Sequence, residues 1–274
     1  MSHKYMLKKD KYDKRDYIFE QGLKAAELPK SFDLRPLAPA VYDQGDECSC
    51  SANAGCAART MLAKDPSLYL SRAFLYYNER VLDGSTQEDG GASIRDIVKA
   101  AAKYGICLDS DMPYKPGNYA TAPTQQNYAD AEKYKIGSYS RIGGITAIRQ
   151  ALFSRYQPVL IGMEVFSGMD RQQVIKTGVL PMPPKNESSK GGHAVLAVGY
   201  TETLPQKTAA KLQTKNCFKR LLDFFLKVKP ASGYFIMRNS WGAGWGDKGY
   251  FYAPYAYFTN LNLASDFWTA SVAT

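Results

Sequence analysis

The stretch DQGDECSCSANA, residues 43–54, contains the most informative feature of this chain, a cysteine where a polar loop turns into a helix. An alanine-rich run follows and stops before Asp65-Pro66, so we expect a helix over 50–63 that begins at Cys50. The partial positive charge of a helix N-terminus favours a thiolate and lowers the pKa of a cysteine placed there. Taken alone, such a cysteine is most often a small buried residue, so its role depends on a partner elsewhere.

Histidine is scarce enough in this chain to identify the partner base. There are two, His3 and His193, and only His193 follows Cys50, in GGHAV at 191–195. A thiol becomes a strong nucleophile at neutral pH when an imidazole or a positive field stabilises its anion. We therefore expect His193 to be the base, the alternative being a hydrogen-bonded core histidine that precedes an apolar strand.

A third polar group comes from FIMRNSWG, residues 235–242, where an apolar run ends in Asn239 and is followed by Trp241. This pattern predicts a buried strand that delivers a side chain at its end. The Asn239 amide can accept the proton of the second imidazole nitrogen, and the Trp241 indole can shield that bond from water. The Gln44 carboxamide and the unpaired backbone N–H groups of the turn at Cys50 can hold an oxyanion. These residues predict acyl transfer through a thiol.

Four landmarks occur in the order that papain-like cysteine peptidases have, and the chain resembles this family from about Leu28 to its C-terminus. They are Asp33-Leu34-Arg35, the Gln44-to-Cys50 segment, Gly192-His193-Ala194, and Asn239-Ser240-Trp241-Gly242 followed by Gly244-Trp245-Gly246 and Gly249-Tyr250. The separation 193 − 50 = 143 falls inside the roughly 130 to 150 residues expected from cysteine to histidine. Bacterial members of the family with short leaders look most similar.

The resemblance implies a thiol endopeptidase. Its active site comprises Cys50 as nucleophile, His193 as general base and acid, Asn239 as orienter, Gln44 as oxyanion donor and Trp241 as shield. It also implies peptide or protein substrates and no metal or other cofactor. Two other classes stay open: a transglutaminase-like acyl transferase, which normally has an acidic orienter, and a binding protein that has lost its chemistry.

Substrate contacts are expected along the wall of a cleft. Asp89, Gly90 and Gly91 resemble the segment whose backbone pairs with an extended substrate, since glycine lets a peptide approach closely. Gly90-Gly91 by itself could equally be an ordinary turn. The lining of the pocket for the second residue before the scissile bond is expected from Ala92, Ile94, Met163 and Gly192, with its floor at about 260–263.

The expected fold class is α+β, a papain-like two-lobed fold with a helical left lobe and a β-barrel-like right lobe. The domain limits are 1–27 for a leader and 28–274 for the peptidase, divided into a mostly helical part, 28–115, and a mostly β part, 116–274. From hydrophobic periodicity we expect helices at 50–63, 71–82 and 93–104 and strands at 159–165, 194–200, 234–238 and 250–253.

The chain departs from the family pattern around the nucleophile. Ser51 and Asn53 stand where the family usually has tryptophan and phenylalanine, and Glu47 stands at one end of a disulfide that the family usually has. The other end, Glu88, is not cysteine either. Two carboxylates at Asp46-Glu47 would raise the pKa of a nearby thiolate unless they point to solvent.

Residues 1–27 precede the position where mature family members begin. The segment is highly charged and has an apolar knot, Tyr17-Ile18-Phe19. We expect a short autoinhibitory leader that makes the protein a zymogen, with the knot docked near the substrate subsites. The alternative is a flexible tail without a role.

Residues 201–232 form an insertion relative to the family. It holds seven Lys or Arg and two acids, so 7 − 2 = 5 of the nine net positive charges lie there. A helical stripe of Cys217, Phe218, Leu221, Leu222 and Phe225 is surrounded by Lys215, Lys219, Arg220, Lys227 and Lys229. We expect this helix to pack on the adjacent lobe; the alternative is contact with an anionic ligand or surface.

Composition and length exclude several classes. With 274 residues, 45% of them hydrophobic, the chain can bury a large core. We find no apolar run of membrane-spanning length, no secretory signal and no nucleic-acid-binding module, so a pI near 9.1 alone is a weak reason to expect nucleic acid. As written, the chain is cytoplasmic or exported by an unrecognised route, and we expect a monomer. Five scattered cysteines do not indicate a disulfide framework.

Overall fold

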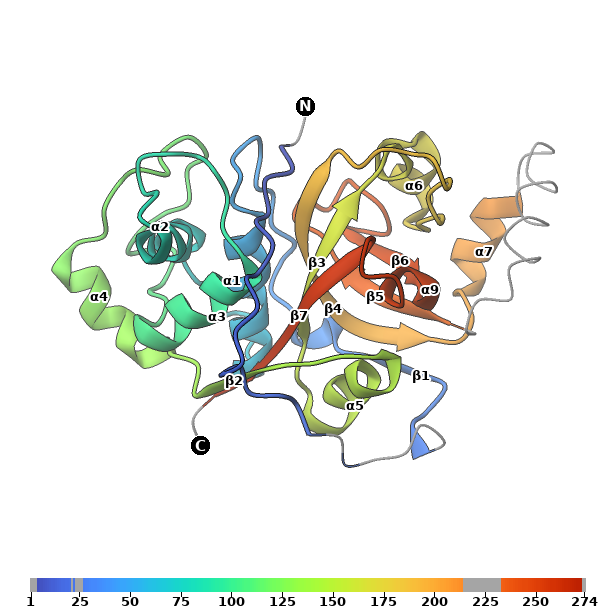
Figure 1. The fold of residues 1–274 in the computed structure, drawn as a ribbon, viewed down its shortest axis with the longest axis horizontal. Helices are drawn as coiled ribbons and strands as arrows, with labels where there is room; N and C mark the ends of the chain where they lie inside the picture. Colours follow the sequence, from blue (N-terminus) through green and yellow to red (C-terminus); the bar gives the residue numbers. More distant parts are fainter. Residues whose placement is uncertain (1–3, 21, 23–26, 214–232, 273–274) are drawn as a thin grey trace.

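The structure is a computed structural model that describes residues 4–20, 22, 27–213 and 233–272. The helical stripe expected within 214–232, with its cysteine and its surrounding basic residues, lies outside the described residues. The chain folds into a helical half and a sheet half that lie side by side (Figure 1). Of the helices that the structure describes, none is both long and apolar enough to cross a membrane.

The helical half contains α1 to α4. Their bounds are α1 Cys50–Ala63, α2 Arg72–Asp83, α3 Ile94–Lys103 and α4 Gln125–Ala131, with the short 3-10 helices η2 Arg35–Leu37 and η3 Glu132–Tyr134. Ser71 caps α2 by accepting from Phe74 N, and a capping box of Ser93 and Asp96 starts α3. A Cβ at Gly55 would lie 2.5 Å from an Ile97 side-chain carbon, so glycine allows α1 to approach α3 closely.

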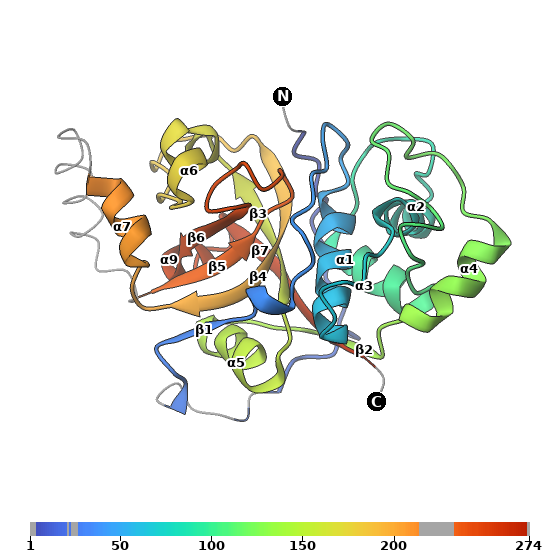
Figure 2. The same cartoon turned by 180° about the vertical axis from the view of Figure 1, so that it is seen from behind.

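The sheet half is built on one antiparallel sheet. Its strands are β1 Ser31–Asp33, β2 Ser138–Arg141, β3 Val159–Val165, β4 Gly191–Thr201, β5 Tyr234–Arg238, β6 Tyr250–Pro254 and β7 Ala264–Ser271. The strand order is β2-β7-β3-β4-β5-β6, and β1 pairs with β4. Around the sheet lie α5 Ile145–Arg155, η4 Ser167–Asp170, α6 Gln172–Thr177, α7 Gln206–Gln213 and α9 Tyr255–Phe258 (Figure 2).

The two halves meet where α1 packs against β4. Both elements are almost entirely buried. The small alanine and glycine residues of α1 let neighbouring elements pack closely around it. β4 is an apolar strand with neighbouring strands on both sides. In the β3–β4 pairing, Met163 lies opposite His193. The packing of α1 on β4 therefore brings the start of the helix toward the start of the strand.

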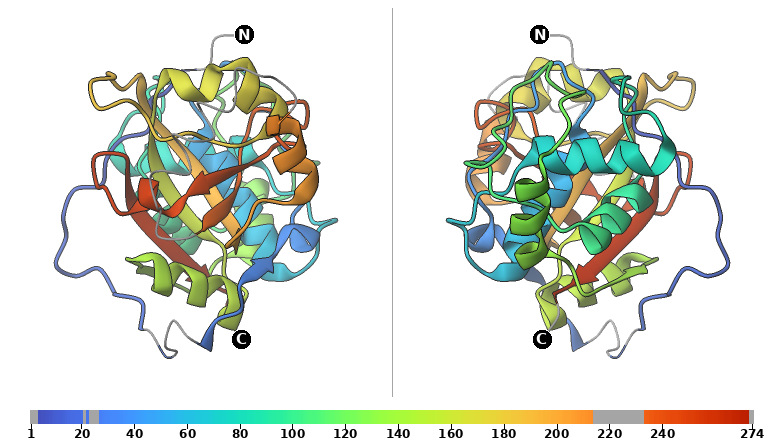
Figure 3. Two further views of the ribbon diagram at one scale, coloured as in Figure 1. Left: turned by 90° about the vertical axis from the view of Figure 1, so that its right-hand side faces the viewer. Right: turned by 90° about the vertical axis from the view of Figure 1, so that its left-hand side faces the viewer.

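The N-terminal segment, residues 4–20, runs along the boundary between the two halves (Figure 1). Met6 pairs with Gly192 of β4, Lys8 pairs with Ser93 before α3, and Ile18 pairs with Arg141 of β2. Figure 3 shows this dark blue segment continuing along the outer edge of the molecule. We call residues 4–20 the N-terminal strap.

The expected α+β class is confirmed, and each predicted helix and strand exists within three residues of its predicted ends. Elements that prediction omitted are short or lack a clear period, such as α5, α6, the edge strand β2 and its neighbour β7. The predicted position of the apolar knot is wrong: Phe19 N donates to Arg141 O at 2.7 Å, at β2, while Tyr17 and Ile18 are exposed. Different strap residues, Tyr5 to Lys8, lie at the junction of the two halves.

Candidate active site

Cys50 is the first residue of α1, as the sequence predicts. Its sulfur accepts a hydrogen bond from Ala194 N at 3.4 Å, so the thiol lies beside the residue that follows His193. The preceding turn is braced by Asn53, whose amide donates to Ser49 O at 2.8 Å, and by Tyr114, whose hydroxyl is 2.6 Å from Ser49 Oγ. The start of the helix is therefore fixed from both sides.

The electrostatics of the thiol differ from the expectation of a lowered pKa. Cys50 is 1% exposed, and burial raises the pKa of its thiol to about 12. The Ala194 hydrogen bond acts in the opposite direction, and a negative charge on Glu79 raises the pKa further whenever Glu79 is ionised. With the strap in place, desolvation outweighs the helix N-terminus and favours the neutral thiol.

His193, Asn239 and Trp241 come together as the sequence predicts. His193 Nε2 lies 2.8 Å from Asn239 Oδ1, so this nitrogen donates and the amide oxygen accepts. Trp241 stacks on the imidazole with ring centroids 4.9 Å apart and an interplanar angle of 29°. His193 is fully buried and Asn239 nearly so, which keeps water from their hydrogen bond.

Gln44 is fully buried beside the same residues. Its Oε1 accepts from Ser240 Oγ at 2.6 Å, its Nε2 donates to Glu47 O at 2.8 Å, and its backbone N–H donates to Ser240 O. A carboxamide nitrogen carries two hydrogens, so one N–H remains beyond the bond to Glu47. This network connects the loop before α1 to the loop after β5.

A model of the papain family of cysteine proteases matches residues 28–268, which is most of the chain. The chain belongs to this family. A peptidase C1-like protein of Acanthamoeba polyphaga mimivirus is 36% identical over 296 residues, covering 97% of this chain and 86% of that protein. Cysteine proteinase 3 of Entamoeba histolytica is 27% identical over 233 residues, covering 84% of this chain and 63% of that protein.

Solved structures agree with this assignment. The crystal structure of xylellain, a cysteine protease from Xylella fastidiosa, superposes with a TM-score of 0.80 at 32% identity and covers 100% of this chain and 99% of its own. Digestive procathepsin L2 of Tenebrio molitor has a TM-score of 0.70 at 20% identity, covering 98% and 78%, and shows the fold alone. The expected family and fold are confirmed, and the chain is a papain-family cysteine protease.

Three of the predicted substrate-binding residues of this papain-family chain contact the backbone of the strap. Leu7 N donates to Gly192 O at 3.1 Å, and Lys8 N donates to Ala92 O at 3.0 Å. A Cβ at Gly91, where φ is +68°, would lie 2.1 Å from Met6 O. Only glycine at this position permits so close an approach.

Other predicted substrate residues have different surroundings. Asp89 accepts from Tyr76 Oη at 2.8 Å and Cys48 N at 2.9 Å, and it pairs with Lys4 of the strap at 3.2 Å. Ile94 and Met163 are buried, as the first residue of α3 and within β3, and Gly90 is half-buried. At the expected pocket floor, Leu263 O accepts from Glu164 N at 2.8 Å, so 260–263 does lie beside β3.

Sequence reasoning missed two residues at the junction. Gly162, in β3, lies against the strap, since a Cβ there would be 3.1 Å from a Leu7 methyl carbon. A lone glycine in an apolar strand signals a close approach and could have identified this position. Tyr5 contacts the edge of the His193 ring at a centroid distance of 6.4 Å, and no pattern in the charged leader singled it out.

Sequence reasoning also missed the acid that anchors the strap. The Asp10 carboxylate is fully buried and accepts from Trp268 Nε1 at 2.7 Å, Arg95 N at 2.9 Å and Arg141 at 3.0 Å. Asp16 forms further ion pairs with Arg95 and Arg141. These contacts connect the strap to α3, β2 and β7.

The structure shows the surroundings of the acidic pair Asp46-Glu47, which distinguishes this chain from the usual family pattern near the nucleophile. Glu47 is buried, and its Oε2 accepts from Gly117 N at 2.9 Å, so only Asp46 of the acidic pair is exposed to solvent. Burial raises the pKa of Glu47, and this shift disfavours a negative charge on Glu47 beside the site. The cysteines that the structure describes, Cys48, Cys50, Cys56 and Cys107, are free thiols.

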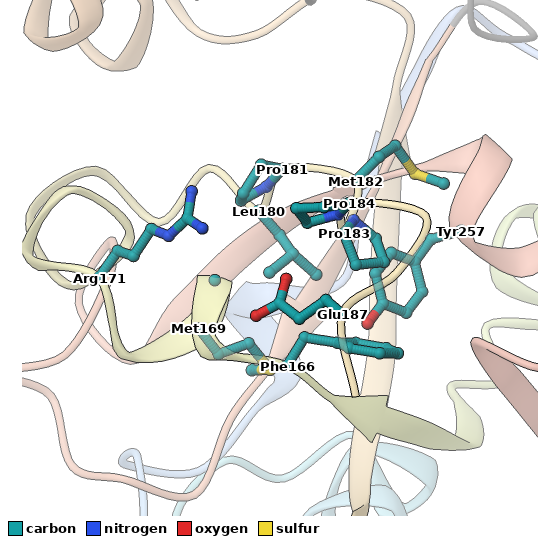
Figure 4. Close-up of a pocket in the computed structure, with 11 residues that line it drawn as sticks. Phe166, Met169, Arg171, Leu180, Pro181, Met182, Pro183, Pro184, Glu187 and Tyr257 are labelled. Carbon is teal, nitrogen blue, oxygen red and sulfur yellow. The ribbon is translucent and has the colours of Figure 1, made fainter. Parts of the chain in front are cut away.

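A separate pocket lies in the sheet half, around η4 (Figure 4). It encloses about 250 Å³ of empty space, part of it open to solvent, and is bordered by Phe166, Pro181 and Tyr257 among other residues. Glu187 lines it and accepts from Ser167 N at 2.8 Å. None of the predicted site residues line this pocket, and within the described residues no group of His, Cys, Asp and Glu is arranged to hold a metal.

Proposed function

We propose that this papain-family protease hydrolyses peptide bonds through a Cys50 acyl-enzyme. The thiolate attacks the peptide carbonyl carbon, the C–N bond breaks, and His193 gives its proton to the departing amine. Water then loses a proton to His193 and attacks the thioester, which releases the acid and restores the thiol. With Nε2 donating to Asn239, Nδ1 is the imidazole nitrogen that exchanges protons with Cys50 in this scheme.

The observation that carries the proposal is the 2.8 Å contact of His193 with Asn239 beside a cysteine hydrogen-bonded to Ala194. The orienter is an amide, which favours a peptidase over a transglutaminase-like enzyme with an acidic orienter. The complete set of Gln44, Cys50, His193 and Asn239 disfavours a binding protein without chemistry. Trp241, stacked on the imidazole, shields it from water in this proposal.

The oxyanion in this proposal is held by Gln44 and by the backbone N–H groups at the start of α1. The second hydrogen of Gln44 Nε2 and the N-terminal position of Cys50 support this role. Gly91, Ala92 and Gly192 pair with an extended substrate, because these residues approach or bond to the strap backbone. Gly90, Ile94 and Met163 support that wall, and Asp89 fixes its conformation.

We also propose that the leader, 1–27, inhibits the peptidase domain, 28–274, and that the protein is a zymogen. Strap residues Tyr5 to Lys8 occupy the backbone positions proposed for substrate, and Tyr5 contacts His193. The neutral thiol favoured by burial is consistent with a latent enzyme. We further propose that the peptidase domain divides at about residue 115 into its two lobes.

A peptide-library cleavage assay tests the proposed function. Wild type is expected to cleave internal bonds after the strap has been displaced, and Cys50→Ala is expected to cleave none. Cys48→Ala is the matched control, because this free thiol lies two residues away. Equal activity of wild type and Cys50→Ala would overturn the assignment of the nucleophile.

If the basic insertion 201–232 contacts an anionic surface, the protein should bind anionic vesicles, and this binding should weaken as the salt concentration rises. Neutralising Lys215, Lys219 and Arg220 together is expected to abolish it. Binding that ignores both salt and these substitutions would leave the insertion as a packing element.

A further inference from the structure

Glu79 of α2 is a buried carboxyl attached to the first turn of α1. Ser51 Oγ, in the residue after the nucleophile, donates to Glu79 Oε2 at 2.5 Å. Glu79 is 0% exposed, and its second oxygen, Oε1, is buried without a hydrogen-bond partner among the described residues. One hydroxyl is too little to compensate the loss of hydration of a buried carboxylate.

Within the part of the chain that the structure describes, Glu79 also has no ion-pair partner. None of the ion pairs within the described part of the chain includes it. The neighbouring Arg80 is engaged elsewhere: its guanidinium donates to backbone oxygens of Tyr76, Thr86, Glu88 and Tyr119. It also lies over the Tyr76 ring at 4.0 Å. A carboxyl in this setting is most stable in its protonated form.

The groups around Glu79 act on its pKa in both directions, and burial has the largest effect. Burial raises the pKa of Glu79 well above its ordinary value. The bond from Ser51 and the charge of Arg80 act to lower it, while Asp96 of α3 and Asp83 of α2 raise it. On α1, a negative charge on Glu79 raises the pKa of both the Cys50 and the Cys56 thiol.

We propose that Glu79 is a positioning residue for the nucleophile: as a neutral acid it holds Ser51 and the first turn of α1, and its ionisation opposes the Cys50 thiolate. Only one of the two groups can carry a negative charge at low cost, so they titrate as a coupled pair. The thiolate is accessible while Glu79 keeps its proton. Loss of that proton sets an upper pH limit on nucleophilicity that His193 does not set.

Two measurements on the full chain test this proposal, which rests on the proposed role of Cys50. The first is infrared spectroscopy of the carbonyl stretch of protonated carboxylic acids at neutral pH. Wild type and Glu132→Gln, an exposed control, are expected to show this band, and Glu79→Gln is expected to lose it. No difference between wild type and Glu79→Gln at neutral pH would overturn the proposal.

The second measurement is the rate of Cys50 alkylation by iodoacetamide against pH, assigned by peptide mass spectrometry. Below the pH at which the infrared band disappears, wild type and Glu79→Gln are expected to react alike. Above it, Glu79→Gln is expected to react about tenfold faster, the effect of one pKa unit on the thiolate. Identical profiles at every pH would contradict the proposal.

Ser51→Ala covers the case in which Glu79→Gln fails to fold. Removing the donor to the carboxylate destabilises the charged form, so the infrared band should persist to higher pH than in wild type. An unmoved band would contradict the proposal. If Cys50 were not the nucleophile, its alkylation would be slow in every variant while the infrared result still reported on Glu79, so the two failures can be told apart.

Discussion

The phenol ring of Tyr5 meets the imidazole of His193 edge-on, with centroids 6.4 Å apart and an interplanar angle of 79°. The same ring lies 6.0 Å from Trp241, and its hydroxyl donates to Asp170 Oδ1 at 3.2 Å. A residue near the start of the chain thus contacts the proposed base and its shield. This contact supports the proposed inhibition by the strap.

Tyr5→Ala is expected to speed labelling of Cys50 by an epoxide inhibitor in the full chain. Aromatic contacts of this kind contribute about 0.5–1.5 kcal/mol beyond area burial, so the rate should rise roughly threefold to tenfold. Tyr12→Ala is the control, because Tyr12 is 91% exposed in the same strap. Equal rates for the two variants would argue that the strap does not guard the site.

Asp10→Asn is expected to loosen the strap without changing the site itself. The substitution keeps the shape but weakens the charged bonds from Arg141 and Trp268, and each such loss costs about 1–3 kcal/mol. Peptidase activity of the full chain should therefore rise about fivefold or more. Asp13→Asn, which alters an acid bonded to Arg15 within the strap, should change little. A rise in both variants would point to a nonspecific charge effect.

Acid is expected to weaken the contact of Lys4 with Asp89. Burial alone would raise the pKa of Asp89, but bonds from Tyr76, Cys48 N and Lys4 hold it below the usual range. Lys4 lowers the pKa of Asp89 only while the strap is bound, so its stabilisation is complete above the strap-free pKa and is lost as pH falls through the strap-bound one. Because Lys4 is half exposed, its share is about 1 kcal/mol or less.

Hydrogen exchange of the Leu7 and Lys8 amides measures this effect, because these amides donate to Gly192 O and Ala92 O of the peptidase domain. After correction for intrinsic exchange, protection in wild type should fall as the pH drops below about 3.9, the ordinary pKa of an aspartate. In Lys4→Met the fall should be shallower. The same slope in both proteins would show that Lys4 and Asp89 are not linked to strap binding.

Gln44→Ala is expected to lower kcat far more than it raises KM, because an oxyanion donor acts in the transition state. The usual loss for one donor is about 10²–10³-fold in kcat. Gln87→Ala, at an exposed position outside the site, is the control. A rise in KM with unchanged kcat would assign Gln44 to substrate binding instead.

Local patterns predicted the site well because its residues come from regular elements. The alanine-rich run predicted the start of α1 at Cys50, and the apolar runs predicted the strands that carry His193 and deliver Asn239. The hydrogen bond between those two residues connects sequence positions 46 apart, and spacing alone could not give its length. The family pattern supplied that pairing.

Sequence patterns did not predict the contacts and the burial that depend on long-range packing. The charge pattern of the leader does not reveal that Asp10 is buried against Trp268, or that Tyr5 and not Tyr17 reaches the junction. The lowered pKa expected for Cys50 came from the helix N-terminus, a local effect. Burial by distant segments overrides it, and no local pattern encodes that burial.

Labelling of the full chain by an epoxide inhibitor, located by peptide mass spectrometry, is the most direct test of whether Cys50 is the nucleophile. We predict one adduct, on Cys50, formed faster in Tyr5→Ala and lost in His193→Ala. An adduct on Cys48 in place of Cys50, or labelling of Cys50 that does not depend on His193, would contradict it.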